Sequence, residues 1–219
     1  VTAQNTGNVI NSDIALTAAG TVSFSRNSAA VGTLTINGLI SGSFGLTFTT
    51  PNVASNNNLQ TVVLGSANTY TGNTTIDTGN INNTTSIKAG VDNALPATTV
   101  LTLDGGTGAG SGRTVTYDLN GHNQTLAGLT NVTGLSLRNQ RVNNTGSLAT
   151  LTIDNSADYS YGGKVTSGSY TTTSTIIGAI ALTKQGVGSL TLVASNGYTG
   201  ATQVLDGTLE LTGIGAINN

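Results

Sequence analysis

Cysteine, methionine and tryptophan are all missing from this 219-residue chain, which also contains only two prolines. Without cysteine the chain has no disulfide, no thiolate nucleophile and no cysteine-rich zinc site. Charged side chains are scarce too, at 7% of the residues against about 25% in an average globular protein. Solubility must therefore come from the hydroxyl and amide groups of Thr, Ser and Asn.

Charge and hydropathy argue against two classes of partner. The seven Lys and Arg residues are scattered singly and the net charge is −2, so the chain offers no basic stripe to nucleic-acid phosphates. It has no run of about 18 apolar residues and no basic amphipathic helix. We therefore expect no nucleic-acid partner and no direct membrane insertion of this segment.

Short segments in which apolar and polar residues alternate recur along the chain. Their period of two predicts strands with one buried face, for example at residues 33–36, 100–103, 115–119 and 148–153. Most are followed by a turn that contains Gly, which readily adopts positive φ. Apolar periodicity of three to four residues is missing, so we expect an all-β chain with almost no helix.

Strands this short could form antiparallel sandwiches, a barrel or a parallel solenoid. Three observations favour the solenoid. Thr, Asn, Ser and Val stack well on like residues in successive coils, and the aromatic rings that usually anchor sandwiches and propellers make up only 4% of the chain. Few charges also means little like-charge repulsion between stacked side chains about 4.8 Å apart. At roughly 20–25 residues per coil, the chain would form roughly ten coils.

The clearest internal repeat is a pair of motif copies near residues 46–79 and 182–207. Each copy has an Asn-x-Tyr-Thr-Gly segment after an apolar strand and closes with Gly. The matching residues, which we expect to be structural with each Tyr covering a coil corner, are Tyr70, Thr71, Gly72 and Gly79 in the first copy and Tyr198, Thr199, Gly200 and Gly207 in the second. The first copy also contains an insertion at 51–58, which its Pro and Asn residues predict to be a surface loop.

The second copy, residues 182–211, resembles the passenger-associated transport repeat of bacterial autotransporters, also called the autotransporter-associated β-strand repeat. The resemblance rests on Tyr-Thr-Gly flanked by Leu-Thr-Leu and Gly-Thr-Leu. Residues 64–79 match it more loosely, and flanking pieces at 94–105, 118–129 and 151–155 also look like these proteins. The resemblance implies a right-handed parallel β-helix, export across the inner membrane and passage through an outer-membrane barrel that lies outside this segment.

On this basis the chain is expected to be one continuous segment, residues 1–219, of a longer passenger, because both ends look cut. The predicted function is an extracellular structural or adhesive rod, able to form fibres, at the outer-membrane surface or beyond it, with no enzymatic activity, cofactor or metal. Expected partners are other copies end to end or the rest of its own chain, together with surface glycans. The alternative is a polysaccharide-active or carbohydrate-binding β-helix.

Several residues are candidates for a catalytic or binding role. His122 is the only histidine and is expected to be an exposed turn residue. A glycosidase-type carboxylate pair could be drawn from Asp154 and Asp158, or from Asp104, Asp118 and Asp206, although Asp is common in turns. The Gly-rich run at 105–112 lacks the Lys of a phosphate-binding loop and a following helix, so it is expected to be a flexible loop.

The remaining candidates are tyrosines and threonines. Tyr117, Tyr159, Tyr161 or Tyr170, if solvent-facing, could join the motif tyrosines in stacking on a sugar. Thr-x-Thr pairs such as Thr47 with Thr49 could form a flat ice-binding ladder, but their spacing does not follow a constant coil length, which favours ordinary strand alternation. The polar tract at 159–174 departs from the family pattern, and its start is expected to be a loop.

Overall fold

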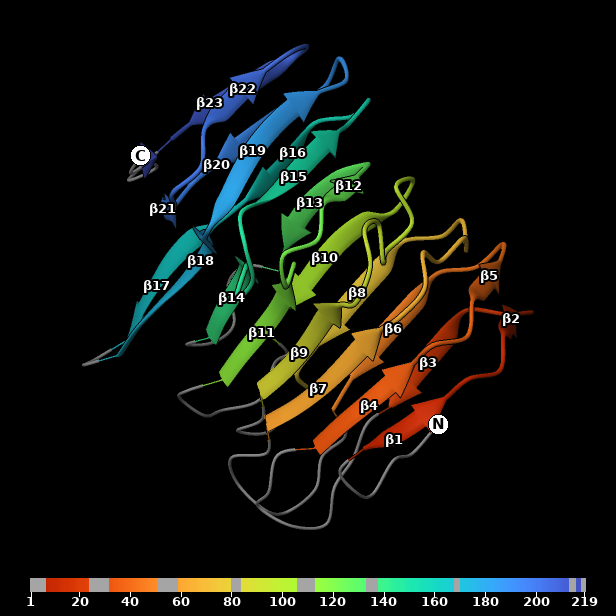
Figure 1. Cartoon of the computed structure of the whole chain (residues 1–219). Coiled ribbons are helices and arrows are strands. Elements are labelled where there is room, and N and C mark those ends of the chain that lie inside the picture. The colour runs from red at the N-terminus through yellow and green to blue at the C-terminus, as the bar shows by residue number, and fades with distance from the viewer. Residues whose placement is uncertain are drawn as a thin grey trace.

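The computed structural model describes residues 7–23, 32–50, 59–79, 84–105, 113–132, 138–167, 170–212 and 216–217. Within these ranges the chain forms strands and turns, with no helix and hence no helical membrane span. The strand pairings there are parallel, except for one hairpin (Figure 1). Of the three candidate architectures, the solenoid is therefore the one that forms.

The coils stack so that the chain visits three faces in turn. The longest sheet, here called the first face, takes one strand from each coil in nine successive layers. Its strands are β1 (Asn8–Ile10), β4 (Gly32–Ile36), β7 (Leu59–Leu64), β9 (Thr84–Ala89), β11 (Arg113–Asp118), β14 (Arg138–Asn143), β18 (Tyr170–Gly178), β21 (Ser195–Tyr198) and β24 (Ala216–Ile217).

The other two faces are each divided into two sheets. The second face consists of β2 (Ile14–Leu16) and β5 (Ile40–Gly42), then β12 (Gln124–Leu126), β15 (Ala149–Asp154), β19 (Ile180–Gln185) and β22 (Thr202–Val204). The third face consists of β3 (Gly20–Ser23), β6 (Leu46–Thr49), β8 (Thr74–Asp77), β10 (Val100–Asp104) and β13 (Gly128–Asn131), then β16 (Tyr159–Tyr161), β20 (Ser189–Leu192) and β23 (Thr208–Leu211). Since parallel strand connections are right-handed in nearly all proteins, this is the predicted right-handed parallel β-helix.

The predicted number of coils, roughly ten, is slightly above the nine layers of the first face, because many coils are longer than the expected 20–25 residues. Residues at the same height in adjacent coils are separated by as few as 19 positions, for Thr191 and Glu210, and as many as 34, for Gln140 and Ser174. Most coils exceed 25 residues, as the contact of Asn37 with Asn11, 26 positions away, illustrates. The extra length lies between strands, where sequence alternation gives no measure of it.

The interior is built from columns of inward-facing side chains, one per coil. Along the first face the residues in register are Leu34, Val62, Ile87, Tyr117, Val142 and Ile176. All six are at most 3% exposed, as the alternation of buried and partly exposed positions along each strand requires. Because each layer covers the one before it, stability comes from contacts between neighbouring coils.

Three expected loops have different outcomes. The start of the polar tract is not a loop, because Tyr159–Tyr161 forms β16 on the third face. The tract continues into β17 (Gly163–Ser167), which pairs antiparallel with β18 as the single hairpin. Alternating Tyr-Ser-Tyr residues satisfy the strand pattern there. The insertion at 51–58 and the Gly run beyond Gly105 lie outside the described residues.

Candidate functional site

The two motif copies sit on different faces of the solenoid. The first copy runs from β7 on the first face, around a corner at residues 65–73, to β8 on the third face. The second copy runs from β20 on the third face, through β21 on the first, to β22 on the second. The same motif residues can therefore form a corner between different pairs of faces.

A buried Asn opens each corner. Asn68 accepts a hydrogen bond from the Ile40 amide through Oδ1 (2.7 Å) and donates through Nδ2 to the Ala94 carbonyl (2.7 Å). It thereby joins three successive coils. Asn196 accepts from the Ile176 amide (2.8 Å) and donates to the Ala194 carbonyl (2.7 Å). Both side chains are almost completely buried, so their amides satisfy backbone groups that water cannot reach.

Tyr70 and Tyr198 follow two residues later and are 0% exposed. Each phenol shares a hydrogen bond with a Thr hydroxyl four residues on, 2.6 Å to Thr74 Oγ1 and 2.8 Å to Thr202 Oγ1. Burial raises the pKa of both phenols, and the Thr contacts offset only part of that rise. The rings are enclosed within the corner and have no exposed face for a sugar to stack on.

The glycines of the motif are required for two separate reasons, close contact with the preceding coil and positive φ. A side chain at Gly72 would collide with the backbone of Gly45, and one at Gly200 with the backbone of Ile180 and Ala181. These corners therefore press directly against the preceding coil.

The closing glycines have a conformational role. Gly79 and Gly207 have φ of +63° and +67°, in the left-handed region that favours glycine. Immediately before Gly72 and Gly200, Thr71 and Thr199 keep exposed side chains. Their backbone amides donate hydrogen bonds to the carbonyls of Gly42 (2.9 Å) and Gly178 (3.0 Å) in the preceding coil.

Replacing the corner Asn should destabilise the fold in both copies. In Asn68→Ala or Asn196→Ala, a buried amide and a buried carbonyl lose their partner, so we expect a loss of roughly 2–4 kcal/mol. Chemical denaturation followed by circular dichroism measures it. The matched control is Asn73→Ala, because Asn73 is exposed and its contact with the Val100 amide is long, at 3.4 Å. Equal, small effects at all three positions would contradict this role.

Lys184 is a feature that the sequence reasoning passed over. It is 0% exposed and lies in an inward-facing column with Leu126, Ile153 and Val204. Its ammonium donates to the carbonyls of Gln185 (2.8 Å), Gly186 (2.6 Å) and Asp206 (3.3 Å).

The Lys184 ammonium thus connects its own turn to the turn of the next coil by hydrogen bonds. Burial lowers its pKa, and the nearby charges of Asp206 and Asp154 partly counteract that effect. The sequence does indicate this role, because the strand alternation places Lys184, a cation, at an inward-facing position.

His122 is only partly exposed, which corrects the expectation of a fully exposed turn residue. Its Nδ1 lies 3.4 Å from Asp92 Oδ1, and its side chain is 33% exposed. Asp92 also accepts a hydrogen bond from the Asn123 amide (3.0 Å), the main reason that its pKa is lowered. The pair ties adjacent coil corners together.

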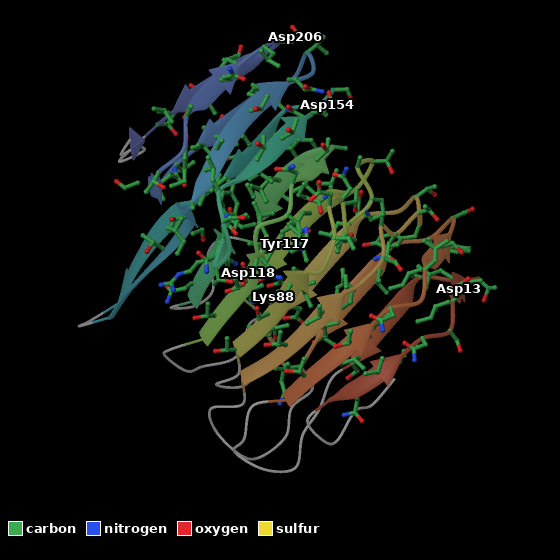
Figure 2. The ribbon with its side chains drawn as sticks, in the orientation of Figure 1. Asp13, Lys88, Tyr117, Asp118, Asp154 and Asp206 are labelled. Atoms are coloured by element: carbon green, nitrogen blue, oxygen red, sulfur yellow. The ribbon has the colours of Figure 1, made fainter. Side chains whose placement is uncertain are left out.

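Of the carboxylates proposed as catalytic, Asp118, Asp154 and Asp206 lie in different coils (Figure 2). Asp118 is buried, lies 3.7 Å from Lys88 and accepts hydrogen bonds from the Thr145 amide and hydroxyl. The remaining carboxylates bond across or within turns: Asp154 to Gln185, Asp158 to the Ser189 amide, and Asp206 to the Gly207 amide. The Ser189 contact lowers the pKa of Asp158.

Sequence reasoning missed one stacked pair of carboxylates. Asp77 lies in register with Asp104 on adjacent strands of the third face. Asp77 accepts hydrogen bonds from the Gly79 amide (2.7 Å) and the Thr49 hydroxyl (3.3 Å). No cluster of three or more metal-binding side chains occurs among the described residues.

Two of the tyrosines offered for sugar stacking are buried, so that hypothesis was wrong for them. Tyr117 is 0% exposed and donates to Gln124 Oε1 (2.5 Å), while Tyr161 is 1% exposed and donates to the Gln140 carbonyl (2.7 Å). Tyr159 is only partly exposed, and the Tyr170 side chain lies outside the described part. Buried Gln124 also bonds the backbone of Leu95, so these polar groups serve internal structure.

Comparison with known proteins agrees with this corner geometry. A family model described as the passenger-associated-transport-repeat matches residues 60–82 and 182–211. These two segments contain both corners, with Tyr70 and Tyr198 at their centres. No curated protein and no solved structure gives a significant match to the chain.

Proposed function

We propose that this chain, an autotransporter passenger-type repeat protein by its two transport repeats, serves as a rod in the secreted passenger of a bacterium. The rod would be displayed at the outer-membrane surface or released from it, acting as an adhesive stalk, spacer or fibre component. The main support for this proposal is the β-helix itself, in which both transport repeats form tight corners between successive coils.

The structure suits folding during export. Each coil presents strand edges and an apolar layer to the next, so coils can be added one at a time without a distant partner. The corner Asn and Lys184 supply polar contacts from coil to coil. A chain that emerges unfolded on the far side of a membrane can therefore fold progressively.

Self-association or continuation of the same chain would use the coil edges. The inward-facing Val204 and Leu211 of β22 and β23 are 50% and 43% exposed, whereas their register partners Lys184 and Leu192 are fully buried. A further coil, from this chain or from another copy, would cover them. Unpaired strand edges of this kind favour addition of another strand.

A non-enzymatic role is part of the proposal. The candidate carboxylates Asp118, Asp154, Asp158 and Asp206 accept hydrogen bonds between and within turns. Asp118, Asp154 and Asp206 lie in different coils (Figure 2). The stacked Asp77 and Asp104 are the observation that would favour the polysaccharide-cleaving alternative. Release of reducing ends from polysaccharides, lost in D77N and D104N, would establish that alternative in place of the rod.

Surface display tests the proposed function directly. The chain is fused between an export signal and the translocator of a characterised autotransporter, and surface exposure is measured with antibody and external protease. We expect a folded, protease-resistant passenger outside the cell. Asn196→Ala should lower the displayed amount, because the second corner folds less stably, while Asn73→Ala should leave it unchanged.

The outcome separates the two levels of the proposal. Retention of the unaltered chain inside the cell would refute the passenger role. Normal display with clumping of the cells, or with binding to glycan-coated surfaces, would support the adhesive role. Normal display without either would reduce the function to that of a spacer.

A further inference from the structure

A column of five threonines runs up the third face, one from each of five adjacent strands. The residues in register are Thr21, Thr47, Thr75, Thr102 and Thr130, from β3, β6, β8, β10 and β13. Their immediate neighbours in each strand point into the core, so the five side chains point outward. At about 4.8 Å per layer the column is about 19 Å long.

The uneven spacing of these threonines along the chain predicted no such ladder, and that prediction was wrong. The connecting segments absorb the differences in coil length, and the strands themselves remain in exact register from layer to layer. The five threonines are therefore regularly spaced on the sheet although they are unevenly spaced in the sequence.

A second column adds a second dimension to the pattern. Two positions further along the strands, Ser23, Thr49, Asp77 and Asp104 are also in register. The two columns lie about 6.6 Å apart, twice the rise of one strand residue. Part of this face is thus a grid of hydroxyl groups: Thr21 with Ser23, and Thr47 with Thr49. The Thr49 hydroxyl also donates to Asp77 (3.3 Å), at the edge of the grid.

The five column threonines are ready to bind without rearrangement. Thr21 is exposed and the other four are partly exposed. Among the described residues, the hydroxyls of all five have no hydrogen-bond partner in the protein. β-Branched side chains have few rotamers and stacking holds the sheet rigid, so little conformational entropy would be lost on binding.

The shape and chemistry of this surface select one kind of ligand. Small molecules prefer concave sites, sugars are usually held by exposed aromatic rings, and protein hot spots are rich in Trp, Tyr and Arg. The two columns contain none of these residues. They present methyl and hydroxyl groups repeating in two directions, which suits a ligand that is itself a two-dimensional lattice of hydrogen-bonding oxygens.

We propose that the Thr column and its Ser23–Thr49 neighbours form an ice-binding surface. The oxygen lattice of hexagonal ice repeats in two directions at distances close to those between and along these strands. The hydroxyls replace water in that lattice and the methyl groups order the water between them. Asp77 and Asp104 interrupt the second column, because a carboxylate holds its hydration shell in a geometry that ice does not share.

The test measures thermal hysteresis and ice recrystallisation with the purified chain. We expect faceted ice crystals and inhibited recrystallisation. Thr75→Tyr places a bulky ring at the middle of the column and should abolish both effects. The matched control is Thr150→Tyr, at a partly exposed outward position of β15 on the second face, where the residue in register is Ala181; it should leave both unchanged. Circular dichroism verifies that each variant is folded.

A gain-of-function variant keeps the proposal open to refutation even if Thr75→Tyr does not fold. Asp104→Thr replaces one of the two carboxylates that interrupt the second column by a hydroxyl and should increase thermal hysteresis. Absence of ice activity in the folded, unaltered chain would overturn the proposal. Activity that survives in folded Thr75→Tyr would also overturn it, as would binding to crystalline polysaccharide without any effect on ice.

Discussion

Above pH 10 the fold should lose stability steeply, because four buried tyrosines cannot ionise while it is intact. Tyr70, Tyr117, Tyr161 and Tyr198 are at most 1% exposed, and burial is the largest cause of a raised pKa in each. Above the ordinary phenol pKa of 10.0, the native state holds protons that the unfolded state has lost, so stability falls as pH rises. Each tyrosine contributes about 1.4 kcal/mol per pH unit, or roughly 5 kcal/mol per unit for the four together.

Ultraviolet absorbance of phenolate and circular dichroism, recorded along one alkaline titration, measure this effect. The four phenolates should appear together with the loss of β-structure. Lys184 acts in the opposite direction, since its lowered pKa favours the native state as pH rises, but it is one group against four. Tyr198→Phe should remove about a quarter of the pH dependence. Titration of all tyrosines near pH 10 with β-structure intact would contradict the burial.

The sequence contained enough information for the strands and their inward faces. Alternation at 33–36 and 148–153 predicted β4 and β15 with one buried side each, and the structure has both. The burial of Tyr117 was available from the same pattern, because Val115, Tyr117 and Leu119 have the same parity and all are 0% exposed. It was missed because a polar hydroxyl was expected to seek water, whereas Gln124 accepts its hydrogen bond inside.

Contacts between coils could not be read from the sequence in the same way. They depend on how much chain each corner consumes, and this differs from coil to coil, so neither the coil count nor the register of Thr47 with Thr75 was apparent. The two motif copies show the reason. Their corners have the same chemistry, yet one turns from the first face to the third and the other from the third to the first and on to the second. Local residues fix the corner, and the stacking of neighbouring coils fixes where it lies.

Removal of the Lys184 ammonium should destabilise the C-terminal coils substantially. Lys184→Met keeps a long side chain in the column of Leu126 and Ile153 and relieves the desolvation of a charge, which alone would be favourable. The carbonyls that the ammonium serves remain, however, and those of Gly186 and Asp206 would lose its donation. These acceptors are only partly buried, so the loss of their donor should cost about 1 kcal/mol each, and we expect a net loss of roughly 1–3 kcal/mol.

Lys88→Met is the matched control, because it makes the same chemical change at a lysine that is partly exposed. The Lys88 side chain is 32% exposed, and its partner Asp118 keeps hydrogen bonds from Asn120 and Thr145 without it, so a loss below about 1 kcal/mol is expected. Denaturant titration and limited proteolysis of residues 189–212 compare the two variants. If both variants lose the same small free energy of unfolding, the hydrogen bonds of Lys184 between turns contribute no more than an exposed charge. If only Lys184→Met loosens the last coils, then one buried cation holds together two adjacent coils within the second transport repeat.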